Sequence, residues 1–176
     1  MIETPQQYTE RMLSYQRGKN PVNFLASTPV RLAGLLRRVP RKKLFARPGG
    51  DRWSIAEILA HLADAEMVTG FRLRLVLGSS GITVQAFDQD VWAGFSQYNK
   101  QDPALSLNAF QAVRRRNVAL LKSIPKELWD NFGMHTERGK ETVTRISEMM
   151  AGHDVNHLRQ IEQILRSGRR RAKTAV

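Results

Sequence analysis

Near the end of the chain, residues 146–164 read ISEMMAGHDVNHLRQIEQI. Apolar residues and two histidines recur in this stretch at steps of three and four, the spacing that places side chains on one face of a helix. The members of this stripe are Ile146, Met150, His153, His157, Ile161 and Ile164. His153 and His157 therefore lie one helical turn apart on the same side, where each imidazole can offer a nitrogen to one divalent ion.

A third histidine, His61, lies in another strongly helical stretch, RWSIAEILAHLADAE at residues 52–66. Two helices that carry one and two histidines are a common way to assemble a three-histidine site inside a helical bundle. Neutral imidazole suits zinc, nickel, copper or iron. We therefore take His61, His153 and His157 as candidate metal ligands. The alternative is that the histidine pair arises by chance and packs in the core or at its boundary.

The segments RWSIAEILAHLADAE and HDVNHLRQI resemble the two signature stretches of the DinB/YfiT-like family of metal-dependent enzymes. Between them, FDQDVWAGFSQYN and GMHTERGKETV are also similar to family sequence, and the likeness runs from about Leu32 to Ile164. The resemblance implies a four-helix bundle with three histidines around a divalent metal, and by motif these are His61, His153 and His157. Activities in this family diverge, so the resemblance leaves the substrate open.

The periodicity of the whole chain predicts an all-α fold, an antiparallel four-helix bundle with one long crossover connection. Four amphipathic segments can bury one another's apolar stripes around one core. The absence of an alternating strand pattern argues against a sheet. We expect the long helices at residues 27–39, 54–77, 103–124 and 142–166 and the connection at residues 78–102.

Local signals mark the helix ends. Ser54 and Glu57 form a predicted capping box, in which each side chain bonds a backbone donor of the first turn. Ser27 is expected to cap a helix that is entered through Pro29. Asp88 can cap a short helix in the long connection, which either packs as a plain crossover or also walls the metal site. A further short helix is expected at residues 5–17.

Polar side chains near the histidines are candidates for supporting the site. Glu57 and Asp64 flank His61 along its helix and could orient the ring, although surface solvation is the alternative for each. Further along the chain, Asp154 or Asn156 could serve elsewhere around the ion. His135 falls in a turn-rich loop at residues 133–139 and is expected at the rim of the pocket rather than as a fourth ligand.

A chain of 176 residues is long enough for one well-cored domain, which we expect at residues 1–168. The basic segment 169–176 has too little apolar content to pack and is expected to be a disordered tail. The absence of cysteine excludes disulfides and a protein thiol nucleophile. No signal peptide and no apolar run of the ~20 residues that cross a bilayer is found, so we expect a cytoplasmic protein without membrane contact.

The formal net charge of +12 would ordinarily suggest an anionic partner. However, the basic residues form separate clusters, with no interleaved aromatic residues on which bases could stack. These clusters lie at residues 37–43, 114–116 and 166–173. We therefore expect a basic surface without a specific nucleic-acid partner.

Three function hypotheses remain open. The first, which the resemblance implies, is a metal-dependent enzyme that uses zinc or nickel on a small-molecule substrate, either as a hydrolase or as an S-transferase with a small-molecule thiol. The second is a metal-binding bundle without turnover, acting as a stress or interaction protein. The third is a basic nucleic-acid-binding module. In the first case the reactive species would be water or a thiolate on the ion. The oligomeric state stays open, and a homodimer is one alternative.

Overall fold

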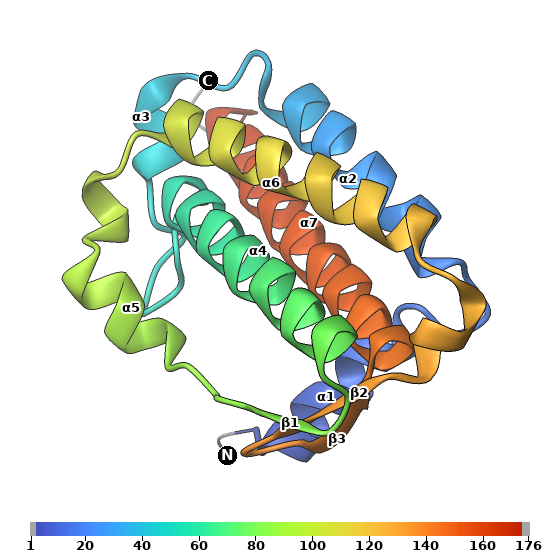
Figure 1. Cartoon of the computed structure of the whole chain (residues 1–176). Helices are drawn as coiled ribbons and strands as arrows, with labels where there is room; N and C mark the ends of the chain where they lie inside the picture. The colour runs from blue at the N-terminus through green and yellow to red at the C-terminus, as the bar shows by residue number, and fades with distance from the viewer. Residues whose placement is uncertain (1–2, 174–176) are drawn as a thin grey trace.

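The computed structural model describes residues 3–173, with side chains up to Ser167. A bundle of four long helices forms its frame, which confirms the predicted fold class (Figure 1). The helices are α2 (Pro21–Leu36), α4 (Ile55–Gly78), α6 (Pro103–Ser123) and α7 (Val143–Lys173). Side chains of Asn20, Ser54 and Asp102 accept backbone N–H groups at the first turns of α2, α4 and α6, as expected of helix caps.

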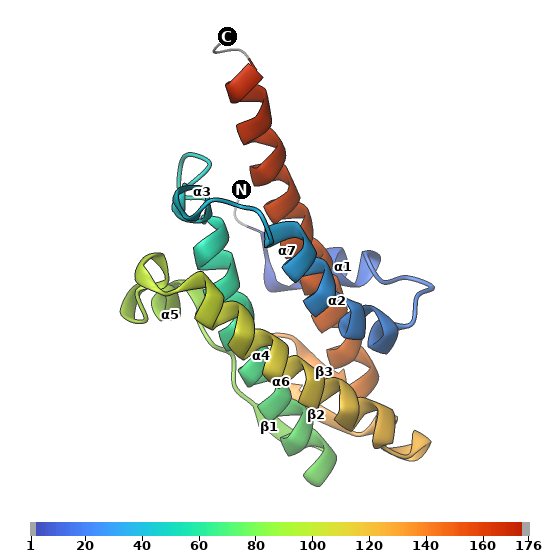
Figure 2. The same cartoon turned by 90° about the horizontal axis from the view of Figure 1, so that it is seen from above.

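The order of the helices around the bundle explains the long connection. α4 and α6 lie side by side and run in the same direction, whereas α2 and α7 run in the opposite direction (Figures 1 and 2). The chain must therefore return along the bundle between α4 and α6, which a short loop cannot do. This connection contains β1 (Ile82–Val84), α5 (Gln89–Phe95) and a 3₁₀ turn (Tyr98–Lys100), and Asp88 caps α5 as predicted.

A small three-stranded sheet lies at one end of the bundle, and our expectation of no sheet was wrong (Figure 1). β1 pairs in parallel with β2 (Phe132–His135), and β2 pairs antiparallel with β3 (Gly139–Thr142), so the segment expected as a loop is a hairpin. The strands have only three or four residues, too few for an alternating pattern to stand out. Gly133 allows the pairing, since a Cβ there would lie 2.6 Å from Cγ2 of Val84.

Helix α2 starts at Pro21 rather than near Ser27, because Asn20 provides the cap. Pro29 consequently lies inside the helix, where it has no N–H to donate to the carbonyl oxygen four residues earlier. That oxygen, of Leu25, instead accepts a hydrogen bond of 3.2 Å from Nη1 of Arg114. An interior proline is tolerated here because a side chain from α6 replaces the missing donor.

Two short helices and the end of α7 complete the description. α1 (Pro5–Ser14) lies within the short helix predicted at residues 5–17, and it packs against α7. α3 (Arg41–Phe45) begins within the basic cluster at residues 37–43. α7 continues to Lys173, beyond its predicted end, and residues 174–176 of the predicted tail lie outside the described residues. The division into a domain and a tail stays a prediction.

The core consists of two apolar clusters with a polar layer between them. One cluster, near the sheet, includes Leu73, Val118 and Met150, and the other includes Ile58, Phe110 and Ile161. Between them along the helices lie the buried side chains of Glu66, His61, Arg114, Asn117, Asp154 and His157. Buried polar groups of this kind require partners. The middle of the bundle is therefore the candidate location of a functional site.

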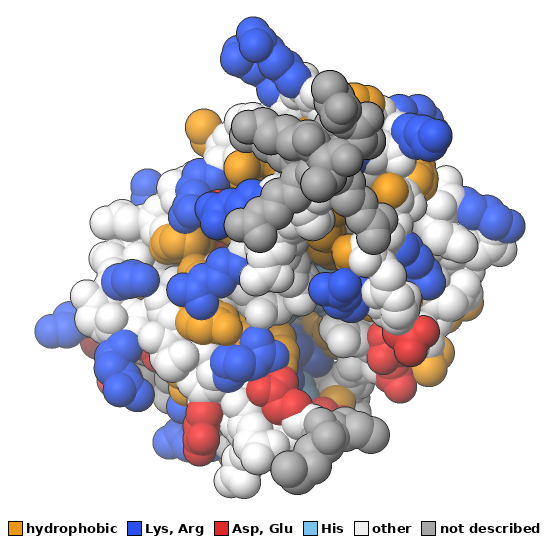
Figure 3. Space-filling model, turned by 180° about the vertical axis from the view of Figure 1, so that it is seen from behind, with side chains coloured by type: hydrophobic (Ala, Val, Ile, Leu, Met, Phe, Trp, Pro, Cys, Tyr) orange, Lys and Arg blue, Asp and Glu red, His pale blue; other side chains and the backbone are white. Residues whose placement is uncertain are grey.

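Basic side chains are spread over the surface. On the face seen in Figure 3, Lys and Arg stand singly or in small groups among apolar and acidic side chains. The predicted cluster at residues 114–116 is not a surface cluster: Arg115 and Arg116 are exposed, but Arg114 is only 1% exposed. Among the described helices, none has an apolar stretch long enough to cross a bilayer.

Candidate metal centre

Three imidazoles meet in the middle of the bundle, His61 from α4 and His153 and His157 from α7. Nε2 of His153 lies 2.9 Å from Nε2 of His61 and 3.0 Å from Nε2 of His157. One ring nitrogen from each residue lies within 4.8 Å of the other two. Two nitrogens each ~2.1 Å from one ion would be about 3 Å apart at an octahedral angle and about 3.4 Å apart at a tetrahedral one. The spacing thus fits the coordination of a single divalent ion.

The protonation state of the three rings also suits a metal. Burial lowers the pKa of His61 and His153 well below the usual value, and the neighbouring histidines lower it further. Burial also lowers the pKa of His157 to about 4. The rings are therefore neutral at neutral pH, the form that binds metal ions. His61, His153 and His157, which we took as candidate ligands from the sequence, therefore suit a divalent metal ion.

Gln160 orients one of the rings, and our sequence analysis missed it. Its Oε1 lies 2.8 Å from Nδ1 of His157. Since an amide oxygen only accepts, the ring must carry its proton on Nδ1, which leaves the lone pair of Nε2 free for an ion. A signal was present in the sequence, because Gln160 follows His157 at the i, i+3 spacing that brings helical side chains together.

Glu57 and Asp64, expected to orient His61, are held by other groups. Glu57 accepts the backbone N–H of Ser54 at 2.8 Å, which completes the predicted capping box, and it forms an ion pair with Arg47. Asp64 accepts a hydrogen bond of 2.6 Å from the hydroxyl of Tyr98. Among the described residues, Nδ1 of His61 has no hydrogen-bond partner. The structure therefore brings neither carboxylate to the ring.

Asp154 belongs to a buried ion network next to the histidines. Its carboxylate and that of Glu66 flank the guanidinium of Arg114, at 3.0 Å from Nη2 to Oδ1 of Asp154 and 2.7 Å from Nη2 to Oε2 of Glu66. Asn117 donates a hydrogen bond of 2.8 Å to the other oxygen of Glu66. Burial raises the pKa of Glu66, although Arg114 opposes this shift. The network holds α4, α6 and α7 together beside the site.

Asn156 and His135 lie apart from the three rings. Asn156 accepts a hydrogen bond of 2.9 Å from Nη1 of Arg11, which ties α1 to α7. His135 is buried on β2 rather than in the predicted loop, and its Nδ1 accepts the backbone N–H of Glu137 at 3.2 Å. It is not part of the three-histidine cluster.

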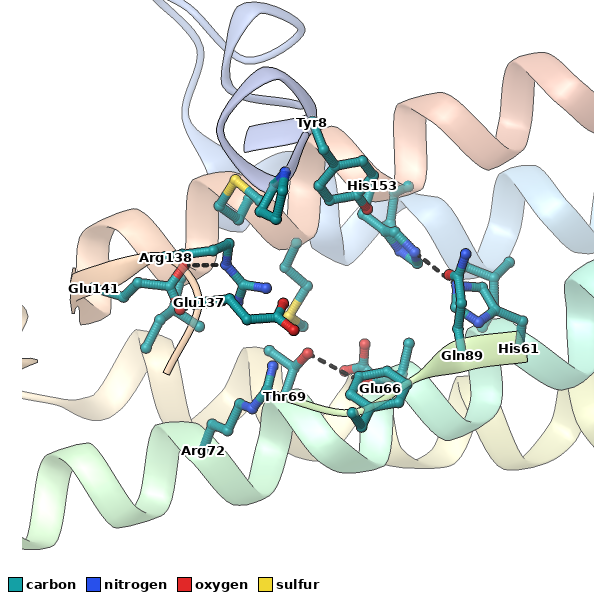
Figure 4. Close-up of a pocket in the computed structure, with 18 of the residues that line it drawn as sticks. Tyr8, His61, Glu66, Thr69, Arg72, Gln89, Glu137, Arg138, Glu141 and His153 are labelled. Atoms are coloured by element: carbon teal, nitrogen blue, oxygen red, sulfur yellow. Dashed lines mark hydrogen bonds and ion pairs between the residues drawn. The ribbon is translucent and has the colours of Figure 1, made fainter. Parts of the chain in front are cut away.

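Two cavities flank the histidines. The first, of about 450 Å³, is lined by His61 and His153 (Figure 4), and the second, of about 530 Å³, is lined by His157. Tyr8 from α1 and Gln89 from α5 line both cavities. The long connection therefore does wall the site, one of the two alternatives that its sequence left open.

Comparison with known proteins agrees with this arrangement. "Putative metal-dependent hydrolase OB0782" of Oceanobacillus iheyensis is 26% identical over 118 residues, which cover 67% of this chain and 67% of that protein. "Putative metal-dependent hydrolase YfiT" of Bacillus subtilis is 25% identical over 122 residues, 68% of this chain and 67% of that protein. The matched part thus spans about two thirds of the length of these curated relatives.

A solved structure and a family model also match this chain. The structure of YfiT from Bacillus subtilis, described as a probable metal-dependent hydrolase with an unusual four-helix bundle topology, matches with a TM-score of 0.78 and 19% identity. The match covers 95% of this chain and 90% of that one and concerns the fold. The model of the DinB superfamily matches residues 25–161, a range that contains all three histidines. With its four-helix frame and this match, the chain belongs to the DinB superfamily.

Proposed function

We propose that this protein is a divalent-metal-dependent hydrolase whose ion is held by His61, His153 and His157. The observation that carries the proposal is the convergence of three neutral imidazoles, His61 and His157 buried and His153 partly buried, beside two cavities. Three protein ligands leave further positions for water or substrate, which is typical of catalytic rather than structural metal sites. The names of the relatives, which describe metal-dependent hydrolases, support the same reaction class.

When bound, the ion would supply a water of lowered pKa, near ~7, and zinc or nickel suits this donor set. The chain's own groups would position the ligands and the substrate. Gln160 holds His157 in the tautomer that binds. Burial raises the pKa of Tyr8, so its hydroxyl stays protonated and can donate a hydrogen bond to a substrate oxygen. Figure 4 shows Tyr8 beside His153 at the wall of the first cavity.

Transfer to or from a small-molecule thiol is the alternative within the same site. The chain has no cysteine, and none of the described cavity residues specifies a thiol. This alternative rests on the family resemblance alone, so we place hydrolysis first. A metal-binding bundle without turnover is the remaining hypothesis, and the experiments below separate it from both.

The ligand set is tested by metal content. Plasma mass spectrometry of the purified protein should find a single divalent ion per chain. His157→Ala removes one of the three donors and should lose most of this metal. The matched control is His135→Ala, which removes a buried histidine outside the cluster and should keep the metal. Unaltered metal content in His157→Ala would reject the assignment.

The reaction class is tested by turnover. Metal-loaded protein is assayed on a panel of esters, amides and phosphoesters, with and without a chelator and with and without a small thiol. Hydrolysis that needs no thiol, stops with the chelator and returns with zinc or nickel supports the proposal. Turnover only with a thiol would assign a transferase, and turnover by metal-free protein would refute the mechanism. Bound metal without turnover on the whole panel would favour the non-catalytic hypothesis.

A further inference from the structure

The cavity beside His61 and His153 continues along α4 as far as Arg72. One face of the helix lines it, through side chains that recur at helical spacing between these two residues. The interval from His61 to Arg72 corresponds to a rise of ~16 Å along the helix axis. Figure 4 shows Arg72 and Arg138 at the end of the cavity opposite to His61. The cavity thus has a histidine end and a guanidinium end.

Three guanidinium groups line this cavity, and they differ in their partners. Arg114 is paired on both sides within the buried network. Arg138 is paired with Glu141 through two hydrogen bonds of 2.7 and 3.0 Å. Arg72 is the one of the three that has no carboxylate oxygen within 4.0 Å among the described residues. Its charge is therefore available to a ligand.

Arg72 is held in place without being neutralised. Its Nη2 donates to the backbone oxygen of Gln85, and its guanidinium lies 5.6 Å from the ring centroid of Phe87. Burial and, after it, the positive charge of Arg138 lower the pKa of Arg72 to about 10, against the opposing charges of Glu141 and Glu137. Both effects penalise the charged form, and an anion bound at this point would relieve both. The remaining N–H groups match the geometry of a carboxylate or phosphate.

We propose that Arg72, beside Arg138, is an anion-binding subsite, and that the substrate carries a carboxylate or phosphate group remote from the bond that is cleaved. The position of that bond at the histidine end rests on the proposed function. Glu137 lies at the same end of the cavity as Arg72 and is exposed. Its negative charge opposes an incoming anion, so removing it should strengthen binding.

The subsite is tested first without turnover. Metal-free protein is titrated with inorganic phosphate and with glutarate, a dicarboxylate, because a bound metal would itself attract both anions. The affinity of every variant is measured by isothermal titration calorimetry. In the wild type, the Nε–H signal of Arg72 in NMR spectra, assigned by its absence in Arg72→Gln, shows whether the anion binds at this residue. Arg72→Gln should weaken binding about tenfold or more, as expected for a charge-assisted hydrogen bond. Glu137→Gln should strengthen it, and the preference between the two probes distinguishes phosphate from carboxylate.

Arg116→Gln is the matched control, since it removes the same charge from an exposed position outside both cavities. It should retain the wild-type affinity. Arg72→Lys keeps the charge but loses the planar fork, and its affinity should lie between those of wild type and Arg72→Gln. Equal losses in Arg72→Gln and Arg116→Gln, or an unchanged Nε–H signal at saturating anion, would overturn the proposal.

The second test uses turnover by metal-loaded protein. The substrates are 4-nitrophenyl esters of dicarboxylic acids and their uncharged methyl esters of equal length. The ratio of kcat/KM for the charged and uncharged esters should exceed one, and it should fall about tenfold in Arg72→Gln but not in Arg116→Gln. Anion binding at Arg72 without any hydrolysis would reject the proposed function and keep the subsite. Hydrolysis without preference for the charged ester, and without anion binding, would reject the subsite and keep the hydrolase.

Discussion

A Cβ atom on Gly152 would lie 2.1 Å from the carbonyl oxygen of Met12, so α7 and α1 touch backbone to backbone one residue before His153. No side chain larger than hydrogen fits between the two helices at this point. The contact holds α1 against α7, and with it Tyr8, which lines both cavities at the histidine cluster. A single glycine thus sets how closely this wall approaches the site.

Gly152→Ala is expected to push α1 away from α7. The added methyl group cannot be accommodated without a backbone shift, and overpacking of this kind costs about 1–3 kcal/mol of unfolding free energy. Denaturant titration measures the loss. The control is Gly34→Ala in α2, where a Cβ meets nothing within 4 Å and the better helix propensity should stabilise slightly. Equal stabilities of the two variants would contradict this account of the contact.

Gln160→Leu should weaken metal binding without unfolding the bundle. The variant loses the amide oxygen that keeps the proton of His157 on Nδ1. Loss of such an outer partner typically lowers metal affinity by about 10- to 100-fold. Competition with a chromophoric chelator measures this affinity. Gln163 is the same residue type one helix turn further along α7 and makes no hydrogen bond to a histidine among the described residues, so Gln163→Leu serves as the control. If both variants bind metal like the wild type, Gln160 has no role in the site.

Arg114→Met should destabilise the protein severely. The change leaves the carboxylates of Glu66 and Asp154 buried without their shared cation. Breaking a buried ion pair by removing one partner costs about 3–5 kcal/mol, whereas an exposed substitution such as Arg115→Met costs within about 0.5 kcal/mol. Urea denaturation of both variants provides the comparison. A loss below about 1 kcal/mol in Arg114→Met would mean that the network contributes little to stability.

The stability of the metal-free protein should depend on pH through His135. Burial and, after it, the charge of Arg138 lower its native pKa from 6.5 to about 4. Between these values the unfolded chain binds a proton that the native state does not, so stability falls as pH falls. At its steepest the loss is about 1.4 kcal/mol per pH unit. The total loss of unfolding free energy is largest at pH values below the native pKa, and there is no loss at pH values well above the pKa of the unfolded chain.

His135→Asn provides the control for this pH dependence. Asparagine does not titrate, so the contribution of position 135 drops out while the other groups titrate as before. The unfolding free energy of the wild type, relative to the variant, should therefore decrease as the pH is lowered from about 7 to about 5. Denaturant titrations at several pH values measure the difference. A difference that stays constant with pH would show that His135 has an ordinary pKa in the native state.

Local pattern was enough to predict the long helices and the histidine pair of α7. Helical periodicity placed His153 and His157 on one apolar face, and Ser54 with Glu57 marked the start of α4 through a capping box that the structure contains. These predictions succeeded because each depends on side chains within one or two turns of each other. The same local reasoning explains a failure. Glu57 was assigned to the site as well, but its carboxylate is already occupied by the cap and by Arg47.

The remaining features depend on partners that are distant in the sequence. Arg114 looked like part of a basic surface cluster, yet it is buried because Glu66 and Asp154 reach it from two other helices. Pro29 looked like a helix start, yet it sits inside α2 because Arg114 bonds the carbonyl it leaves free. A charge or a missing donor is tolerated in a core only where the fold supplies its complement. The periodicity of one segment does not show whether a segment distant in the sequence will provide the complementary charge or hydrogen-bond donor.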